Sequence, residues 1–217
     1  MRIAIVGTGL LGRTLGAAWT QHGHEVVLGS RDPAAFRSDD FIVTKVADAA
    51  SRADLVVNTV PGIHAVAALT AQPQGWLDDK VLLDVCNPDD GDGEVERSQP
   101  ESIAEQLQAA LPAARVVKAL NTFSRLIMVD PARLPEPTSV FLSGDDSDAK
   151  QTVVGLLVDL GWGREQLLDL GPLRTARATE GMIAMYYAVR DALGTREFNY
   201  RVVAIAGSTD DDDREDA

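Results

Sequence analysis

The sequence predicts an α/β protein built on a doubly wound, mostly parallel sheet with helices on both faces. Apolar, strand-like runs alternate with amphipathic, helix-like segments along most of the chain. Runs at 55–57 and 81–83 have no polar face, which is typical of parallel strands buried on both sides. A glycine-rich turn directly follows the first run, at the position where a Rossmann-type fold carries one.

The expected strands are residues 2–6, 25–29, 55–60, 81–85, 115–119 and 139–143. The expected helices are residues 11–21, 63–71, 102–111 and 148–160. The pattern then changes, with a short apolar run at 166–170, one long helix at 175–193 and a strand or docked segment at 200–206. Met182, Ile183, Tyr186, Val189 and Leu193 form an apolar stripe on the long helix, which indicates a core face or a dimer interface.

The first strand leads into Gly7, Thr8, Gly9, Leu10, Leu11 and Gly12, a complete G-x-G-x-x-G pattern between a strand and a helix. Gly7 permits the tight turn, Gly9 lets the backbone approach a pyrophosphate, and Gly12 lets the helix pack closely on the strand. The amides at the start of the following helix would point at the phosphates. The pattern therefore predicts a dinucleotide-binding site.

The end of the second strand indicates which dinucleotide binds. An NAD site usually has an acidic residue there to accept from the ribose 2′-hydroxyl, whereas this chain has Ser30 and Arg31. A guanidinium can hold a 2′-phosphate with two hydrogen bonds, and the Ser30 hydroxyl can donate to it. Asp32 and Pro33 could in addition begin a helix. The sequence therefore favours NADP(H).

Composition excludes other classes of function. The net charge of -13 argues against a nucleic-acid partner, and no apolar stretch is long enough to span a membrane. Cys86 is the single cysteine, and it lies at the end of an apolar run, where burial is expected. A single cysteine excludes an intrachain disulfide, and the first strand leaves no room for a signal peptide. Both observations favour a cytoplasmic enzyme. No His or Cys cluster has the spacing of metal ligands. His22 and His24 are expected to be surface caps at a helix end.

Several motifs together resemble the family of NADP-dependent reductases of the deazaflavin coenzyme F420, to which the reductase domains of membrane ferric reductases are related. The motifs are residues 7–12 with 29–31, 59–61, 87–88, 117–122, and 169–173 with Ala176, Arg177 and Glu180. The chain departs from the archaeal members at two places: Ala34 and Ala35 occupy the stretch where those members carry a further basic residue, and Asn121 replaces a histidine.

The resemblance implies a role for each strand end. Thr8, Gly9, Leu10 and Leu11 would contact the pyrophosphate, and Val60, Pro61, Asn87 and Asn121 would lie along the rest of the cofactor. His64 could line the same cleft or be an ordinary residue of a first helical turn. The second redox ring is expected to approach Thr122, Phe123, Gly171, Pro172 and Leu173.

On these grounds the chain divides into an NADP-binding domain (1–145), a C-terminal extension that completes the coenzyme site and a homodimer interface (146–207), and a disordered acidic tail (208–217). Hydride transfer between NADP(H) and F420 needs positioning and a dry cavity rather than a catalytic acid. Alternatives are a flavin or ferric reductase, an imine or carbonyl reductase, and a non-catalytic NADP(H) sensor. An imine reductase needs a proton donor, for which Lys118, Tyr186 and Tyr187 are available, although Lys118 could simply face solvent or phosphate.

Overall fold

A computed structural model of the chain describes residues 1–36, 38–89 and 100–205. Its strands form one sheet in the order β3-β2-β1-β4-β5-β6-β7-β8. The strands are β1 (Arg2–Val6), β2 (Glu25–Ser30), β3 (Ile42–Lys45), β4 (Leu55–Asn58), β5 (Val81–Asp84), β6 (Arg115–Ala119), β7 (Val140–Gly144) and β8 (Leu167–Asp169). The helices are α1 (Leu10–Gln21), α2 (Val46–Ser51), α3 (Gly62–Thr70), α4 (Ile103–Ala110), α5 (Arg125–Val129), α6 (Ser147–Asp159), α7 (Ala176–Gly181) and α8 (Ile183–Leu193).

Strand direction decides where a site can form. The strands β1 to β6 are mutually parallel, so their carboxyl ends meet at one edge of the sheet. β7 runs antiparallel to β6, and β8 is parallel to β7, so these two strands point the other way. The strand order reverses between β1 and β4, and open α/β sheets bind ligands beyond the carboxyl ends at this point.

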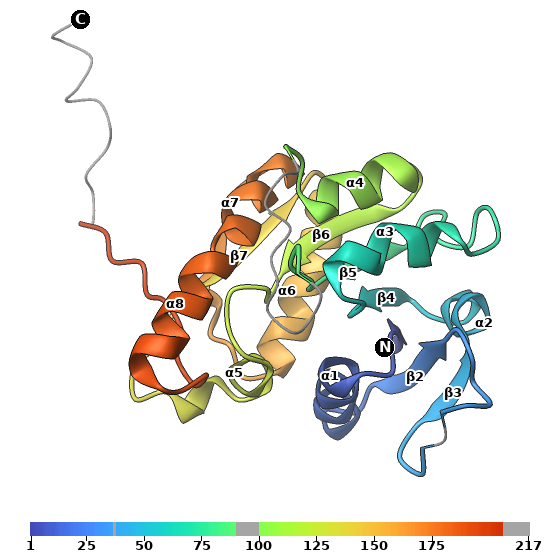
Figure 1. The fold of residues 1–217 in the computed structure, drawn as a ribbon, viewed down its shortest axis with the longest axis horizontal. Helices are drawn as coiled ribbons and strands as arrows, with labels where there is room; N and C mark the ends of the chain where they lie inside the picture. The colour runs from blue at the N-terminus through green and yellow to red at the C-terminus, as the bar shows by residue number, and fades with distance from the viewer. Residues whose placement is uncertain (37, 90–99, 206–217) are drawn as a thin grey trace, which may run out of the picture.

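Helices cover both faces of the sheet and bury a separate apolar cluster on each (Figure 1). On one face, α1, α5 and α6 pack around the fully buried side chains of Trp19 and Trp162. On the other, α2, α3, α4 and α7 pack on β4, β5 and β6. The prediction of a doubly wound, Rossmann-type sheet is confirmed. The expected extension after residue 145 adds β8 to the same sheet and α6 to the first cluster.

Two features of the C-terminal part differ from the sequence prediction. The helix expected at 175–193 is divided into the 3-10 turn η3 (Leu173–Thr175), α7 and α8, with the boundary at Met182. Leu193, expected in the apolar stripe, is 60% exposed. The segment after α8 forms no strand up to residue 205, but it docks through the backbone carbonyl of Tyr200, which accepts from the Ser139 amide at 2.8 Å. The expected acidic tail lies outside the described residues.

Candidate functional site

The glycine loop between β1 and α1 has the geometry that its sequence predicts. Gly7 has a φ of +117°, and a Cβ there would lie 2.6 Å from Thr59 Oγ1. A Cβ on Gly12 would lie 2.6 Å from the Gly7 carbonyl oxygen, so only glycine permits this approach of helix to loop. Thr59 fixes the loop from the β4 side, because its hydroxyl donates to the Val6 carbonyl at 2.9 Å.

Gly9 differs from its two neighbours because no atom lies within 4 Å of the position that a Cβ would occupy. It precedes α1, whose first turn contains no acidic residue and receives no side-chain cap. The amides and positive dipole end of α1 therefore meet open space rather than a protein carboxylate. This cradle fits a pyrophosphate at the carboxyl edge of the sheet.

The loop after β2 presents Arg31 to solvent. The guanidinium makes no ion pair with any residue of the described ranges, so it can meet an incoming phosphate. Asp32 does not begin a helix, contrary to one expectation. Its carboxylate accepts from the amides of Ala34 and Ala35 at 3.1 and 3.2 Å in a short turn, while Ser30 Oγ accepts from the Asp32 amide. The turn holds Asp32 to its own backbone and leaves Arg31 unneutralised.

At the end of β4, the chain turns tightly into α3. Pro61 precedes the helix and is exposed, and His64 lies exposed on its first turn. Gly62, which the sequence analysis did not single out, is buried against the loop after β5: a Cβ there would lie 1.9 Å from the Asn87 carbonyl oxygen. The glycine thus lets the β4 and β5 loops approach each other. In the sequence, only its position directly after a strand-end proline indicates this role.

The carboxyl ends of β5 and β6 are joined by a pair of amide side chains. Asn121 Nδ2 donates to Asn87 Oδ1 at 2.9 Å, and Asn87 Nδ2 donates to the Asn121 backbone carbonyl at 2.7 Å. The preceding residue, Leu120, has a φ of +65°, a left-handed conformation that costs a leucine about 1–3 kcal/mol. The surrounding structure therefore holds Asn121 in one specific position. The structure brings the predicted residues Asn87 and Asn121 into direct contact.

Beneath this edge lies a buried charged cluster that the sequence did not reveal. Lys118 is 1% exposed, and its ammonium donates to Asp84 Oδ2 at 2.8 Å, to Glu180 Oε1 at 2.7 Å and to the Cys86 carbonyl. The expectation that Lys118 could face solvent or phosphate is wrong, because β6 lies in the middle of the sheet and is covered on both faces.

The same cluster reaches the loops at the carboxyl edge. Asn58 donates to Asp84 at 2.8 Å and accepts from the Val60 amide at 3.2 Å. Glu180 also accepts from the amides of Ile103 and Ala104 at the start of α4. Through these contacts Lys118 fixes the turns after β4 and β5, and it ties α7 to the sheet.

Electrostatics shift the pKa values of Lys118 and Cys86 in this cluster. Burial alone lowers the pKa of Lys118, but the carboxylates of Asp84 and Glu180 outweigh it and hold that pKa above its ordinary value. Burial, with the charge of Asp84, raises the pKa of Cys86 well above its usual range, so its thiol stays protonated. The expected burial of Cys86 is confirmed at 6% exposure.

Three residues expected near the second ring follow β8 rather than one of the parallel strands β1 to β6. The Gly144 amide donates to the Gly171 carbonyl, and Gly144 pairs with Val117, so Gly171 lies level with the middle of β6 rather than with its end. Pro172 and Leu173 continue from there toward the amino-terminal edge of the parallel strands. The approach of Gly171, Pro172 and Leu173 to the second ring stays a prediction.

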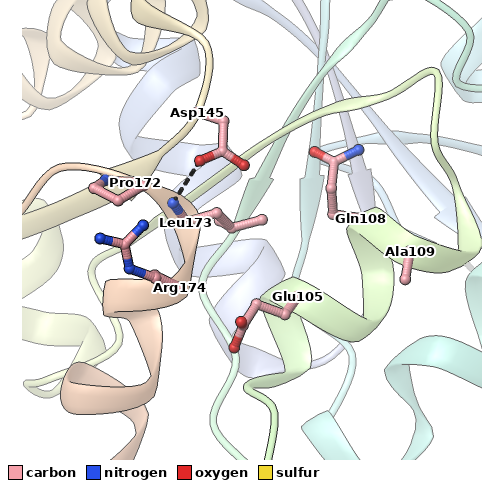
Figure 2. Close-up of a pocket in the computed structure, with 7 residues that line it drawn as sticks. All are labelled: Glu105, Gln108, Ala109, Asp145, Pro172, Leu173 and Arg174. Carbon is pink, nitrogen blue, oxygen red and sulfur yellow. Dashed lines mark hydrogen bonds between the residues drawn. The ribbon is translucent and has the colours of Figure 1, made fainter.

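Pro172 and Leu173 line a separate, open cavity of about 380 Å³ between α4 and η3 (Figure 2). The Leu173 amide donates to Asp145 Oδ1 at 3.0 Å there, and its side chain is 2% exposed. Phe123 is also turned away from the carboxyl edge, because its ring contacts Trp162 in the core, with 5.1 Å between the centroids. Thr122 is buried beside Asn121, shortly after the end of β6.

Other polar side chains are engaged in structural contacts. The Tyr187 hydroxyl donates to Asp89 at 2.9 Å, and Tyr186 stacks on Phe198 at 5.2 Å. Burial, followed by the charge of Asp89, raises the pKa of Tyr187. His24, expected as a surface cap, instead has a ring that is 10% exposed and lies 3.0 Å from Asp159 on α6.

Within the described ranges, no three acidic, His or Cys residues are grouped as a metal site, and no helix is long and apolar enough to cross a membrane.

Comparison with known proteins gives a consistent result. The family model described as "NADP oxidoreductase coenzyme F420-dependent" matches residues 2–88. The crystal structure of a candidate F420-dependent NADP-reductase from Arthrobacter sp. FB24 is 38% identical, with a TM-score of 0.86, and the match covers 94% of this chain and 100% of that one. An F420-dependent NADP reductase from Methanothermobacter thermautotrophicus is 29% identical over 83% of this chain and 85% of the relative.

A second group of relatives is longer. Rat metalloreductase STEAP3 is 32% identical over 83% of this chain, which spans 36% of that protein. A reductive aminase from Aspergillus terreus is 16% identical with a TM-score of 0.63, over 89% of this chain and 62% of that one, and shows only that the fold is shared.

Proposed function

The chain belongs to the family of coenzyme F420-dependent NADP oxidoreductases, and from that premise we propose that it transfers a hydride between NADP(H) and the deazaflavin F420. NADP-dependent oxidoreduction is common to the family. The choice of F420 as the second partner is the proposal, and it extends to this chain what the names of its relatives say of them.

The carboxyl edge of β1 to β6 fits the cofactor. In the proposed arrangement, Gly7, Thr8, Gly9, Leu10, Leu11 and Gly12 cradle the pyrophosphate, and Ser30 and Arg31 bind the 2′-phosphate. Val60, Pro61, His64, Asn87, Asn121 and Thr122 border the rest of the cofactor and the acceptor ring. When bound, NADPH supplies a hydride from the nicotinamide C4 position, and the accompanying proton of the reduced deazaflavin comes from solvent.

The observation that carries the proposal is that two of the three predicted proton donors, Lys118 and Tyr187, give their hydrogen bonds to groups inside the protein. Lys118 gives its hydrogen bonds to two carboxylates and a carbonyl inside the protein. Tyr187 donates to Asp89, and the Tyr186 ring is stacked on Phe198. Reduction of an imine or carbonyl must protonate the product, whereas ring-to-ring hydride transfer needs only two rings held about 3–3.5 Å apart.

The test is a comparison of acceptors at matched concentration. We expect NADPH to be oxidised by F420 and not by a cyclic imine, as followed by the absorbance of the reduced nicotinamide. Loss of NADPH with the imine but not with F420 would refute the proposal. NADPH binding without oxidation by any acceptor would identify a sensor.

A flavin or ferric reductase is the second candidate, and the metalloreductase relatives favour it. These acceptors also take electrons without a protein acid. If a free flavin or a ferric chelate is reduced and F420 is not, that acceptor takes the place of F420 in the proposal. The proposed NADP(H) site would not change.

A further inference from the structure

Three arginines lie near enough to Tyr186 for their charges to act on its phenol, although the chain as a whole carries a net charge of -13. Burial raises the pKa of Tyr186, and the nearby charges of Arg196, Arg190 and Arg125 act in the opposite direction. Arg125 begins α5, shortly after Asn121 at the carboxyl edge. Arg190 and Arg196 line an open cavity of about 410 Å³ at the end of α8.

Carboxylates neutralise this arginine cluster only in part. Arg190 pairs with Asp191 at 2.7 Å and lies 4.7 Å above the Tyr187 ring. Arg125 and Arg196 make no ion pair with any residue that the structure describes, and the nearby Glu197 is taken by Arg133. The C-terminal carbonyls of α8 do not attract anions. Any attraction for an anion must therefore come from the arginine side chains.

Polar atoms without partners lie in the same region. Ser124 Oγ, Arg125 Nε and the Tyr200 hydroxyl are buried and have no hydrogen-bond partner among the described residues. Tyr200 is connected to Tyr186 through Phe198: the rings of Tyr200 and Phe198 have centroids 6.0 Å apart, and Phe198 stacks on Tyr186. Buried donors without acceptors are costly, so these atoms indicate a group that offers several acceptor oxygens.

The cluster also borders the proposed reaction site. Tyr187 ties α8 to Asp89 in the loop that carries Asn87, and Arg125 follows the end of β6. Figure 1 shows α8 at the opposite end of the molecule from β2 and β3, where the 2′-phosphate of NADP(H) is expected. The arginines are therefore placed for the acceptor rather than for the dinucleotide.

We propose that Arg125, Arg190 and Arg196 bind the phosphate-bearing tail of the hydride acceptor and so select anionic acceptors over neutral ones with the same ring. Guanidinium groups bind phosphate with paired, charge-assisted hydrogen bonds. The inference rests on the proposed hydride transfer, but it concerns the tail of the acceptor and not the identity of its ring.

The experiment uses two pairs of acceptors that differ in their tail: F420 with its neutral, phosphate-free deazaflavin core, and FMN with riboflavin. For the pair that turns over, we expect the phosphate-bearing member to have a KM about tenfold or more below that of the neutral one. In the double variant Arg125→Gln/Arg196→Gln this ratio should approach one, while the KM for NADPH stays unchanged. Arg174→Gln, an exposed arginine beside the cavity of Figure 2, is the matched control and should keep the ratio.

Equal KM values within a pair in the unmodified protein, or a ratio that survives the double variant, would overturn the inference. A rise in the KM for NADPH would also overturn it, because the arginines would then belong to the dinucleotide site. If only the flavin pair is reduced and its two members differ in KM as expected, F420 is refuted as the substrate but the arginine site is supported. If neither pair is reduced, both proposals fail.

Discussion

Arg31 stands exposed at the end of β2, in a loop where Asp32 is bonded to its own turn. We expect Arg31→Ala to weaken NADPH binding about tenfold to a hundredfold, because a charge-assisted, bidentate contact contributes roughly 1.5–3 kcal/mol. Binding of NADH should change little, since NADH has no 2′-phosphate. Titration of both cofactors by fluorescence measures the two affinities. Equal losses for NADPH and NADH would show that Arg31 does not contact the 2′-phosphate.

A second prediction for a single residue concerns Lys118: the variant Lys118→Met removes the cation that two buried carboxylates share. Breaking a buried ion pair in this way costs about 3–5 kcal/mol. For a chain of this size that corresponds to a fall in Tm of roughly 6–20 °C. Lys45→Met, at an exposed lysine that ends β3, is the control and should leave the Tm almost unchanged. A Tm for Lys118→Met close to that of the control would mean that Asp84 and Glu180 are stable without the ammonium.

The sequence could not place Lys118 in the core. It lies between Val117 and Ala119, and alternation along a strand assigns a polar residue to a solvated face. That rule fails in a strand covered on both sides, where a charge needs partners that are distant in sequence. Here the partners are Asp84 and Glu180, which are 34 and 62 residues away. By contrast, the glycine loop was predictable, because the tight turn at Gly7 and the close approach of Gly12 to it are set within residues 7–12, although Thr59 also fixes the loop from β4.

At the level of elements, the start of α3 depends on its contact with the β5 loop. Gly62→Ala would place a Cβ 1.9 Å from the Asn87 carbonyl oxygen, so the two loops must separate. We expect a loss of about 1–3 kcal/mol in unfolding free energy and weaker NADPH binding. Gly155→Ala on α6 is the matched control: no atom lies within 4 Å of its Cβ position, so it should stabilise the helix by about 0.5–1 kcal/mol. Chemical denaturation compares both variants, and similar effects of the two would exclude the contact as the cause.

Elements with weak local signals were missed. The edge strand β3 has four residues and no fully buried side chain, so its apolar pattern is too short to separate from a loop. α2 has six residues and follows it directly. The division between α7 and α8 at Met182 was missed because the apolar stripe continues through it. Longer elements with two buried faces, such as β1 and β6, were predicted with their observed bounds.

For the whole molecule, exposed apolar side chains on α8 and the segment after it support the proposed homodimer. Met185 and Leu193 are 56% and 60% exposed, and Val203 and Ile205 are 78% and 83% exposed. Exposed apolar side chains mark interaction surfaces where they gather into a patch. We expect light scattering to give a dimer mass, and Met185→Glu/Val203→Glu to give a monomer. Ile42→Glu on β3, 68% exposed in the protein, is the control and should leave the mass unchanged. A monomer in the unmodified protein would refute the homodimer.

The packing around Trp19 on α1 is completed only by residues that are synthesised much later. Its indole nitrogen donates to the Leu156 carbonyl at 3.3 Å, 137 residues along the chain, and His24 meets Asp159 across a similar separation. During synthesis at about 5–20 residues per second, this face of the first β-α unit must therefore wait several seconds for α6 to leave the ribosome. The dinucleotide loop is among the first segments made, but the helix that begins at it is among the last to be covered. A nascent chain that stops before α6 would therefore lack the helix that covers Trp19, at the end of α1 remote from the glycine loop.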